Sequence, residues 1–301
     1  MTLEQLRIFI AVAERQHMTA AAAVLGLTQS AASAAIANLE NQYGVALFDR
    51  VGRGIVLTEE GALFLKEARA ILQRTSDAEA VLYDLTQQVR GSLRLAASQT
   101  VGTYWLPGRI VQFRRQYPGV TVACGIANSE QVAAAVRDGE VPLGFIEGAI
   151  ADSLLTSRIV ARDKPVLVVG ANHPWFGRTK PLRPAELAGT AWILREKGSG
   201  TRAVFDAALI QRKIDPARLD ILLELPSNEA VASAVSAGAA ASVLSTSVVL
   251  AGLEAGFLSA VPCDLPERAF SLIRHKRRHL SRCAQAFLAA LDPAAGRTRR
   301  D

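Results

Sequence analysis

The chain is poor in the residues from which most catalytic and metal sites are built. Its 301 residues include only four histidines and three cysteines. No histidine lies beside a nucleophile motif such as GxSxG, and Cys124, Cys263 and Cys283 are widely spaced without a CxxC pair. Dinucleotide fingerprints, P-loops and metal-ligand spacings are also missing. The sequence therefore predicts no enzyme, no metal site and no cofactor. The cysteines are either buried, unreactive side chains or include a redox-sensing thiol, and the sequence leaves both interpretations open.

Long hydrophobic runs are absent as well. No run reaches the roughly 18 apolar residues of a membrane span. The N-terminus has no basic region, apolar core and cleavage site of a secretory signal. We therefore expect a cytoplasmic protein with no membrane partner, and a chain of 301 residues predicts two or three domains.

Negative charge is the scarcer sign, with 28 acidic against 34 basic side chains and a net charge of +6. Residues 1–58 carry four of each sign, whereas residues 274–301 carry eight basic and two acidic side chains. The whole excess therefore lies near the C-terminus, where a solvated surface is the simplest interpretation. Net charge is accordingly poor evidence for a nucleic-acid partner.

The pattern of residues 18–58 is better evidence for a nucleic-acid partner than the net charge. An Ala-rich helical segment ends at Gly26, and Thr28 is a suitable N-cap for a second helix. Two short helices joined by a tight turn define a helix-turn-helix. The second helix has apolar residues at the helical period, which predict its buried face: Ala32, Ile36, Leu39 and Tyr43.

The opposite stripe of this second helix is small or polar and almost uncharged, consisting of Ser30, Ser33, Ala34, Ala37 and Asn41. Such a stripe suits close docking in the major groove of DNA, although a helix pair that only packs is the alternative. Two short apolar runs follow around Arg50 and Arg53 and predict a hairpin wing that contacts phosphates or the minor groove.

These residues resemble the N-terminal domain of LysR-type transcriptional regulators. The resemblance rests on Thr19-Ala-Ala-Ala, Leu27-Thr-Gln-Ser, Leu39-Glu40, Leu47-Phe48, Gly52-Arg53-Gly54 and Leu57-Thr58. It implies a set of DNA-contacting residues: Thr28, Gln29, Ser30, Ser33, Ala34, Asn38, Arg50 and Arg53. The family usually has Pro and a long polar residue where this chain has Ala31 and Ala34. Direct base readout at position 34 is therefore in doubt.

A long helix is predicted from Glu59 to about Val89, with an apolar residue alternately every four and three positions. This 3.5-residue repeat is typical of a coiled coil, and the resemblance implies a homodimer with Phe64, Ile71, Leu82 and Leu85 in its seam. A single helix lying on its own domain is the alternative. The family usually forms dimers of dimers, so we expect a homotetramer.

From Gly91 onward the pattern alternates strands with helices. We expect two α/β lobes joined by two crossings, near 161–164 and 263–268. The resemblance identifies them as a periplasmic-binding-protein-like effector domain. The expected domains are a winged helix-turn-helix (1–58), a linker helix (59–90) and the effector domain (91–301), with lobe I at 91–162 and 266–301 and lobe II at 163–265.

Hydroxyl and amide side chains follow several strands of these lobes, where helix starts offer free N–H groups. With the carboxylate of Glu147 and the guanidinium of Arg202, they form the predicted effector-binding set: Ser98, Gln99, Thr100, Asn128, Ser129, Glu147, Ser199, Thr201 and Arg202. Each loop alone is more simply an N-cap. Glu147 could repel anions, receive an amine or hydroxyl, or pair with a cationic side chain.

The segments 194–202 and 146–148 resemble the branch of the family that controls carbon fixation and sulfur assimilation. The resemblance implies a regulator that binds promoter DNA and a small anionic effector, either an oxyanion or a phosphorylated or carboxylated metabolite. RNA polymerase is a further expected partner. A solute-binding or enzymatic α/β protein with an accessory helix-turn-helix is the alternative, and the missing signal and nucleophile motifs disfavour it.

Overall fold

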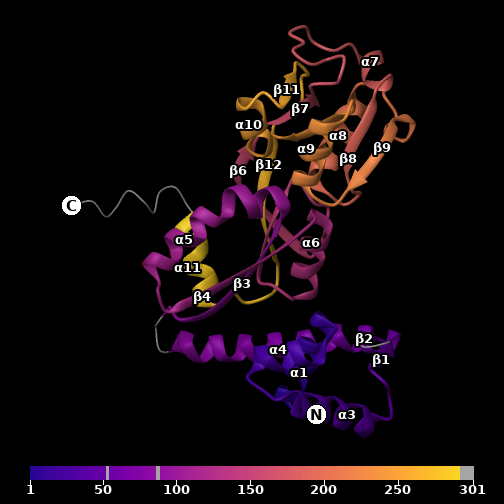
Figure 1. The fold of residues 1–301 in the computed structure, drawn as a ribbon. Helices are drawn as coiled ribbons and strands as arrows, with labels where there is room; N and C mark the ends of the chain where they lie inside the picture. Colours follow the sequence, from indigo (N-terminus) through magenta and orange to yellow (C-terminus); the bar gives the residue numbers. More distant parts are fainter. Residues whose placement is uncertain (52–53, 86–88, 292–301) are drawn as a thin grey trace, which may run out of the picture. The chain divides into compact units, whose positions relative to one another are not determined.

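The computed structural model describes residues 1–51, 54–85 and 89–291 (Figure 1). The chain forms two compact units, Met1–Thr86 and Gln87–Asp301. Among the described helices, none is by itself long and apolar enough to cross a membrane; the pair α2 (Met18–Leu25) and α3 (Gln29–Tyr43) reaches that length only together and is bent by 106°.

The first unit is a winged helix-turn-helix followed by a long helix. Gly26 ends the second helix with φ +69°, a left-handed conformation that glycine adopts without strain. The hydroxyl of Thr28 then accepts a hydrogen bond from the N–H of Ala31 at 3.2 Å and caps the third helix. The elements are α1 (Leu3–Arg15), α2 (Met18–Leu25), α3 (Gln29–Tyr43), β1 (Phe48–Val51), β2 (Gly54–Leu57) and α4 (Glu59–Leu85).

The core of this unit forms where α1, α3, the wing and the first half of α4 meet. Phe9 is fully buried, and its ring lies 5.4 Å from that of Phe48 and 4.9 Å from that of Phe64. The predicted inward face of α3 is confirmed at Ala32, Ile36 and Leu39, which are all buried. It is wrong at Tyr43, which is 56% exposed because the last turn of α3 extends beyond the core.

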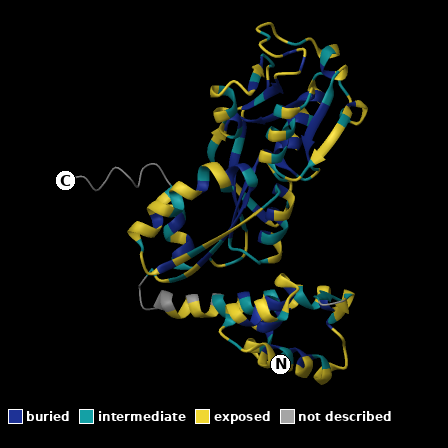
Figure 2. Cartoon of the chain, viewed as in Figure 1, coloured by how far each residue is buried: buried dark blue, intermediate teal, exposed yellow. Residues whose placement is uncertain are grey.

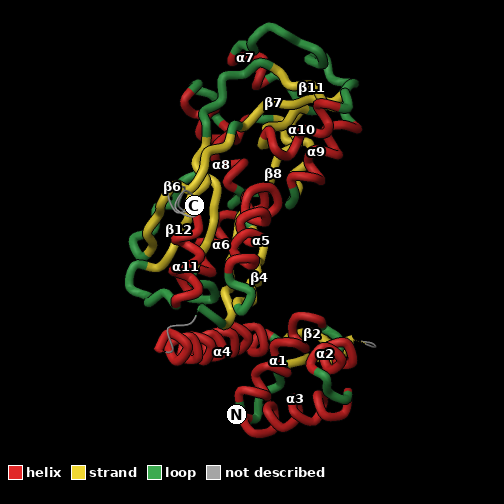
Figure 3. Tube along the Cα trace, turned by 90° about the vertical axis from the view of Figure 1, so that its left-hand side faces the viewer, coloured by secondary structure: helices red, strands yellow, loops and turns green. Residues whose placement is uncertain are grey.

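Helix α4 does not present its predicted seam as one continuous free face. Helix α4 lies beside α1 (Figure 3). Ala68 is buried in the core of its own unit, and Phe64 and Ile71 pack against that core. Leu82, further along the helix, is 65% exposed. The alternative of a helix lying on its own domain therefore holds for the first half of α4. Leu85 ends the helix, and its side chain lies outside the described residues.

The second unit contains two five-stranded sheets. The first has the order β4-β3-β5-β12-β6, in which the neighbours β4, β3 and β5 run parallel and β12 runs antiparallel to β5 and β6. Helices α5 and α11 cover one face and α6 covers the other. Its elements are β3 (Gly91–Ser98), α5 (Leu106–Gln116), β4 (Val120–Ala127), α6 (Ser129–Asp138), β5 (Leu143–Glu147), β6 (Leu155–Asp163), β12 (Arg268–His275) and α11 (Arg282–Leu291).

The second sheet has the order β11-β7-β10-β8-β9 and is covered by α7 and α8 on one face and by α9 and α10 on the other. Its inner strands form a continuous buried layer (Figure 2). The elements are β7 (Pro165–Gly170), α7 (Pro184–Ala188), β8 (Ala191–Arg195), α8 (Gly200–Gln211), a 3-10 turn (Pro216–Arg218), β9 (Asp220–Leu225), α9 (Asn228–Ala237), β10 (Ala241–Ser245), α10 (Thr246–Glu254) and β11 (Leu258–Val261).

The structure adds two strands to those read from the sequence, β6 and β11, both at sheet edges. Two consecutive helical segments follow β3. Residues Val101–Trp105 form a π-helical turn in which the N–H of Leu106 donates to the carbonyl of Val101, and α5 follows. Pro107 in the first turn of α5 has no N–H, so it favours a new helix start at this point.

Candidate functional site

The face of α3 opposite its core is open to solvent. Thr28, Gln29, Ser30, Ala34 and Asn38 are exposed, and Ser33 is half-buried. The carboxylate of Glu40, on the same helix, accepts the N–H groups of Leu47 at 2.7 Å and Phe48 at 3.1 Å. These bonds fix the wing to α3. An uncharged helix face beside a fixed hairpin has the shape required to enter a groove of duplex DNA.

The wing itself is an antiparallel pair in which Phe48 lies opposite Leu57. Arg50 is exposed on β1, where its guanidinium can reach a phosphate. Arg53, the second predicted wing cation, lies outside the described residues. The structure therefore places seven of the eight predicted DNA-contacting residues.

In the second unit, donors from the first sheet and its loops and from α8, which packs on the second sheet, converge on the carboxylate of Glu147. Glu147 ends β5 and is 3% exposed. Its Oε1 accepts the hydroxyl of Ser98 at 3.1 Å and the N–H of Thr100 at 3.1 Å. Its Oε2 accepts the hydroxyl of Thr201, at the start of α8, at 2.9 Å. Four of the predicted effector residues therefore meet at one point.

The counter-ion of this carboxylate is Arg268, which the sequence analysis missed. Its Nη1 donates to Glu147 Oε2 at 2.6 Å and to Thr201 Oγ1 at 2.8 Å, and its Nε donates to Asp163 Oδ2 at 2.6 Å. The side chains of Arg268 and Glu147 are 1% and 2% exposed. Of the three roles considered for Glu147, the structure shows pairing with a cation.

Electrostatics keep Glu147 ionised. Burial raises the pKa of its carboxyl group, but the charge of Arg268 and the donors of Thr100 and Thr201 outweigh burial, so the pKa lies below its ordinary value of 4.5. The start of α8 approaches closely: a Cβ on Gly200 would lie 2.5 Å from the Cβ of Glu147, so only glycine fits there. The cluster is a compact ionic centre between the two lobes.

Hydrogen bonds around this centre tie the lobes together. The side-chain oxygen of Gln99 accepts the N–H of Asn228 at 2.7 Å, and Asn228 Nδ2 donates to Thr100 Oγ1 at 3.0 Å. Gln99 Nε2 and the Tyr104 hydroxyl both donate to Glu229, at 2.8 and 3.2 Å. Gln99 thus belongs to the interlobe contact, and its predicted role in effector binding stays a prediction. Asn228 and Glu229, at the start of α9, were not identified from the sequence.

The remaining predicted effector residues have other contacts. Asn128 caps α6, Ser129 is buried with its hydroxyl 3.5 Å from the carbonyl of Glu147, and Ser199 precedes α8. The guanidinium of Arg202 donates to Asp206 at 2.9 Å and to Glu224 at 3.2 Å. Two carboxylates therefore already pair with Arg202, and its role in effector binding stays a prediction.

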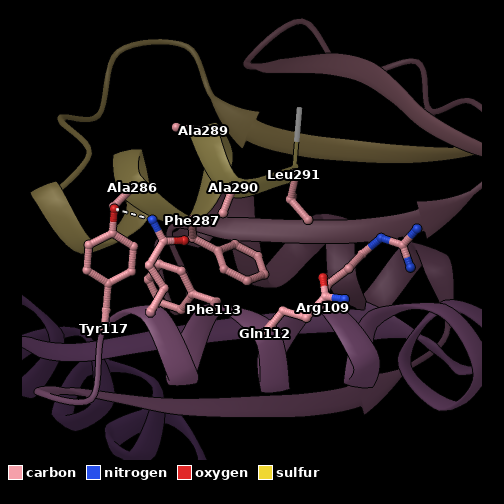
Figure 4. Close-up of a pocket in the computed structure, with 10 residues that line it drawn as sticks. Arg109, Gln112, Phe113, Tyr117, Ala286, Phe287, Ala289, Ala290 and Leu291 are labelled. Atoms are coloured by element: carbon pink, nitrogen blue, oxygen red, sulfur yellow. Dashed lines mark hydrogen bonds between the residues drawn. The ribbon is translucent and has the colours of Figure 1, made fainter. Parts of the chain in front are cut away.

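A separate cavity of about 340 Å³ lies between α5 and α11 (Figure 4). Phe113 and Phe287 form its apolar floor, and Arg109, stacked on the ring of Trp105 at 3.7 Å, lies at its side. None of the predicted effector residues lines it. In the described part of the chain, no group of three or more His, Cys, Asp or Glu side chains is arranged to hold a metal ion.

Two family models match this chain. Residues 3–62 match the bacterial regulatory helix-turn-helix protein model of the LysR family, and residues 86–295 match the LysR substrate binding domain. The chain belongs to the LysR family of transcriptional regulators. It is a DNA-binding regulator with an effector-binding domain and not an enzyme.

Transcriptional regulators that match nearly the whole chain support this family assignment. An uncharacterized HTH-type transcriptional regulator of Escherichia coli K12, YeiE, is 37% identical over 295 residues, which is 97% of this chain and 98% of that protein. A probable RuBisCO transcriptional regulator of Trichormus variabilis is 36% identical over 297 residues, covering 97% and 88%. The resemblance to the carbon-fixation branch thus has relatives in support.

Solved structures show the same architecture. Full-length CbnR in complex with its target DNA superposes with a TM-score of 0.69 at 23% identity, covering 97% of this chain and 99% of that one. The regulatory domain of CcmR from Synechocystis PCC6803, solved in complex with 2-PG, is 27% identical with a TM-score of 0.61, covering 69% of this chain and 98% of that domain.

Proposed function

We propose that this regulator binds operator DNA through the exposed face of α3 and the wing, and that a small anionic effector bound between its two lobes controls it. The proposal rests mainly on one observation. Hydrogen-bond donors from both lobes, those of Ser98, Thr100, Thr201 and Arg268, bind the buried carboxylate of Glu147. Donors arranged around a carboxylate also fit an oxyanion, a phosphate or the carboxylate of a metabolite. The 2-PG complex of CcmR supports this effector class.

The mode of control follows from the interlobe contacts. An anion that engages donors from both lobes binds one lobe arrangement better than others and therefore shifts their equilibrium. The proposed domains, 1–58, 59–90 and 91–301, would pass this shift through the linker helix to paired DNA-binding heads. RNA polymerase is a further partner within this proposal, and we place the protein with its operator DNA in the cytoplasm.

The effector proposal is tested by calorimetry of the full-length protein against sulfate, sulfite, inorganic phosphate and 2-PG. Thr201→Val removes one donor but keeps a similar shape, and we expect about a tenfold loss of anion affinity, the worth of one hydrogen bond to a charged group. Thr246→Val is the matched control, since that hydroxyl donates to the Lys164 carbonyl at the start of α10. Silence of every anion, with a neutral or cationic ligand binding instead, would refute the proposed class.

Dimerisation through α4 is a second part of the proposal. Within the first unit Phe64 and Ile71 pack against its own core, whereas Val81 and Leu82, further along the helix, are 49% and 65% exposed; Leu63, near its start, is 63% exposed as well. Pairing of two copies at Val81 and Leu82 would bury both side chains. The expected homotetramer would add contacts between effector domains.

Leu82→Glu is expected to dissociate the dimer, because the substitution brings an uncompensated charge into the paired apolar surface. Sedimentation velocity over a range of protein concentrations measures this directly. Lys66→Glu places the same side chain at another exposed position of α4 and should leave the oligomeric state unchanged. An intact oligomer with Glu at position 82 would place the interface elsewhere.

A further inference from the structure

The position that an anionic effector needs is already filled by the protein's own carboxylate. Glu147 Oε1 takes the donors of Ser98 and Thr100, and Oε2 takes those of Thr201 and Arg268. A carboxylate offers about four acceptor sites, so these donors saturate it. The donor set and its acceptor match in number, in charge and in distance, between 2.6 and 3.1 Å.

The origins of the donors show that this is more than a pair within one lobe. Ser98, Thr100 and Arg268 come from the first sheet and its loops, whereas Thr201 starts α8 beside the second sheet. The close approach at Gly200 places the start of α8 directly against Glu147. The Glu147 carboxylate therefore makes the same bridge between lobes that an effector anion would make.

We propose that Glu147 is an internal ligand, and that effector binding exchanges its carboxylate for the anionic group of the effector on the same donors. This inference rests on the proposed function. Two anionic groups do not share one set of four donors, because like charges at that distance repel strongly. The exchange must therefore move the Glu147 side chain away from Arg268 and rearrange the interlobe hydrogen bonds next to it, those of Thr100 with Asn228 first.

Competition sets the affinity for the effector. An anion has to displace a group that is held by four donors and tethered permanently beside them, so its apparent affinity is lowered by the fraction of time that Glu147 occupies the site. Removing the charge of the internal ligand should thus strengthen anion binding. A residue that merely stabilises the site would have the opposite effect when substituted.

The test compares wild type with Glu147→Gln, both full length, by calorimetric titration with sodium sulfate and with inorganic phosphate. Glutamine keeps the size of the side chain but is a weaker acceptor without charge, so we expect binding of both anions to tighten by about tenfold or more. Glu186→Gln is the control, because it also removes a carboxylate from an arginine, Arg178, away from the cluster, and should leave anion affinity unchanged. Equal or weaker binding to Glu147→Gln overturns the inference.

A second variant tests the site without relying on an effector. Glu147→Ala leaves the four donors without an acceptor and opens space for a small carboxylate. We expect its Tm to be below that of wild type and to rise with sodium acetate but not with sodium chloride at equal ionic strength. Wild type, whose site is filled, should respond equally to both salts. No specific acetate effect on the variant would show that the donors do not form a carboxylate site.

These experiments distinguish failure of the anionic effector proposal from failure of the internal-ligand proposal. If acetate restores Glu147→Ala but sulfate and phosphate bind neither wild type nor Glu147→Gln, and sulfite and 2-PG are silent too, the internal carboxylate stands and the anionic effector class falls. If anions bind wild type and bind Glu147→Gln no better, the anionic effector class stands and the internal ligand is refuted.

Discussion

Arg268→Met is expected to destabilise the second unit by about 3–5 kcal/mol, the usual cost of removing one partner from a buried ion pair. The guanidinium is 1% exposed and is the charged partner of both Glu147 and Asp163, so its loss leaves two buried carboxylates without a counter-ion. Methionine fills a similar volume, and the loss therefore reports mainly the missing charge and hydrogen bonds.

Urea unfolding followed by tryptophan fluorescence measures this loss selectively, because Trp105, Trp175 and Trp192 all lie in the second unit. Arg183→Met is the control. Arg183 pairs with Glu186 while its side chain stays 83% exposed, so its replacement should cost less than about 1 kcal/mol. A comparably small loss for Arg268→Met would mean that the cluster contributes little to the stability of the unit.

The difference in the free energy of unfolding between wild type and Arg268→Met should depend on pH in a defined direction. Arg268 holds the pKa of folded Glu147 below its ordinary value of 4.5, so the stabilisation is fully present above that pH. It is lost as pH falls through the folded pKa, where the carboxylate takes up a proton. The difference in unfolding free energy between wild type and Arg268→Met should therefore narrow as pH falls, because burial without the counter-ion raises the pKa of Glu147 in the variant, and this carboxylate takes up a proton before that of wild type.

Ser33→Glu is expected to weaken operator binding by about a hundredfold or more, since it turns a carboxylate toward the phosphates of the groove that we propose α3 enters. Ser33 is half-buried on the exposed side of α3, and its hydroxyl can be replaced without opening the core. The free energy of unfolding should change by no more than about 0.5 kcal/mol, as for most surface substitutions.

Gel shifts with promoter-proximal DNA, at stated salt concentration, measure the effect. Gln42→Glu introduces the same charge at an exposed position on the last turn of α3, half a helical turn around from Ser33, and serves as the control. We expect its affinity to remain within about threefold of wild type, because surface charge away from the groove is screened over about 10 Å. Unchanged affinity for Ser33→Glu would remove α3 from the groove.

The helix-turn-helix could be predicted from the sequence because its signals are local. Gly26, Thr28 and the spacing of Ala32, Ile36 and Leu39 each act within a few residues. Tyr43 continues the same spacing but lies where the neighbouring elements no longer cover α3. Periodicity alone does not tell where a core ends.

For the effector domain, too, only features with local sequence signals could be predicted. Hydroxyl residues after strands, such as Ser98 and Thr100, could be found because helix starts prefer them. Strand β6 was missed because it is a sheet-edge strand with arginines and exposed positions instead of alternating apolar residues. Arg268 was missed because its partner Glu147 is 121 positions away, and no local pattern encodes that pairing.

Strand β12 also determines the order in which a growing chain can complete its two sheets. All strands of the second sheet lie between Pro165 and Val261, so that sheet can close once residue 261 has left the ribosome. The first sheet begins earlier, yet it waits for β12, which inserts between β5 and β6. Until then both strands have unpaired edges, and Glu147 and Asp163 have no counter-ion. The half of the domain that is synthesised first is therefore the half that finishes folding last. A nascent chain that stalls before residue 268 exposes unpaired strand edges, which can form hydrogen bonds with strands of other chains.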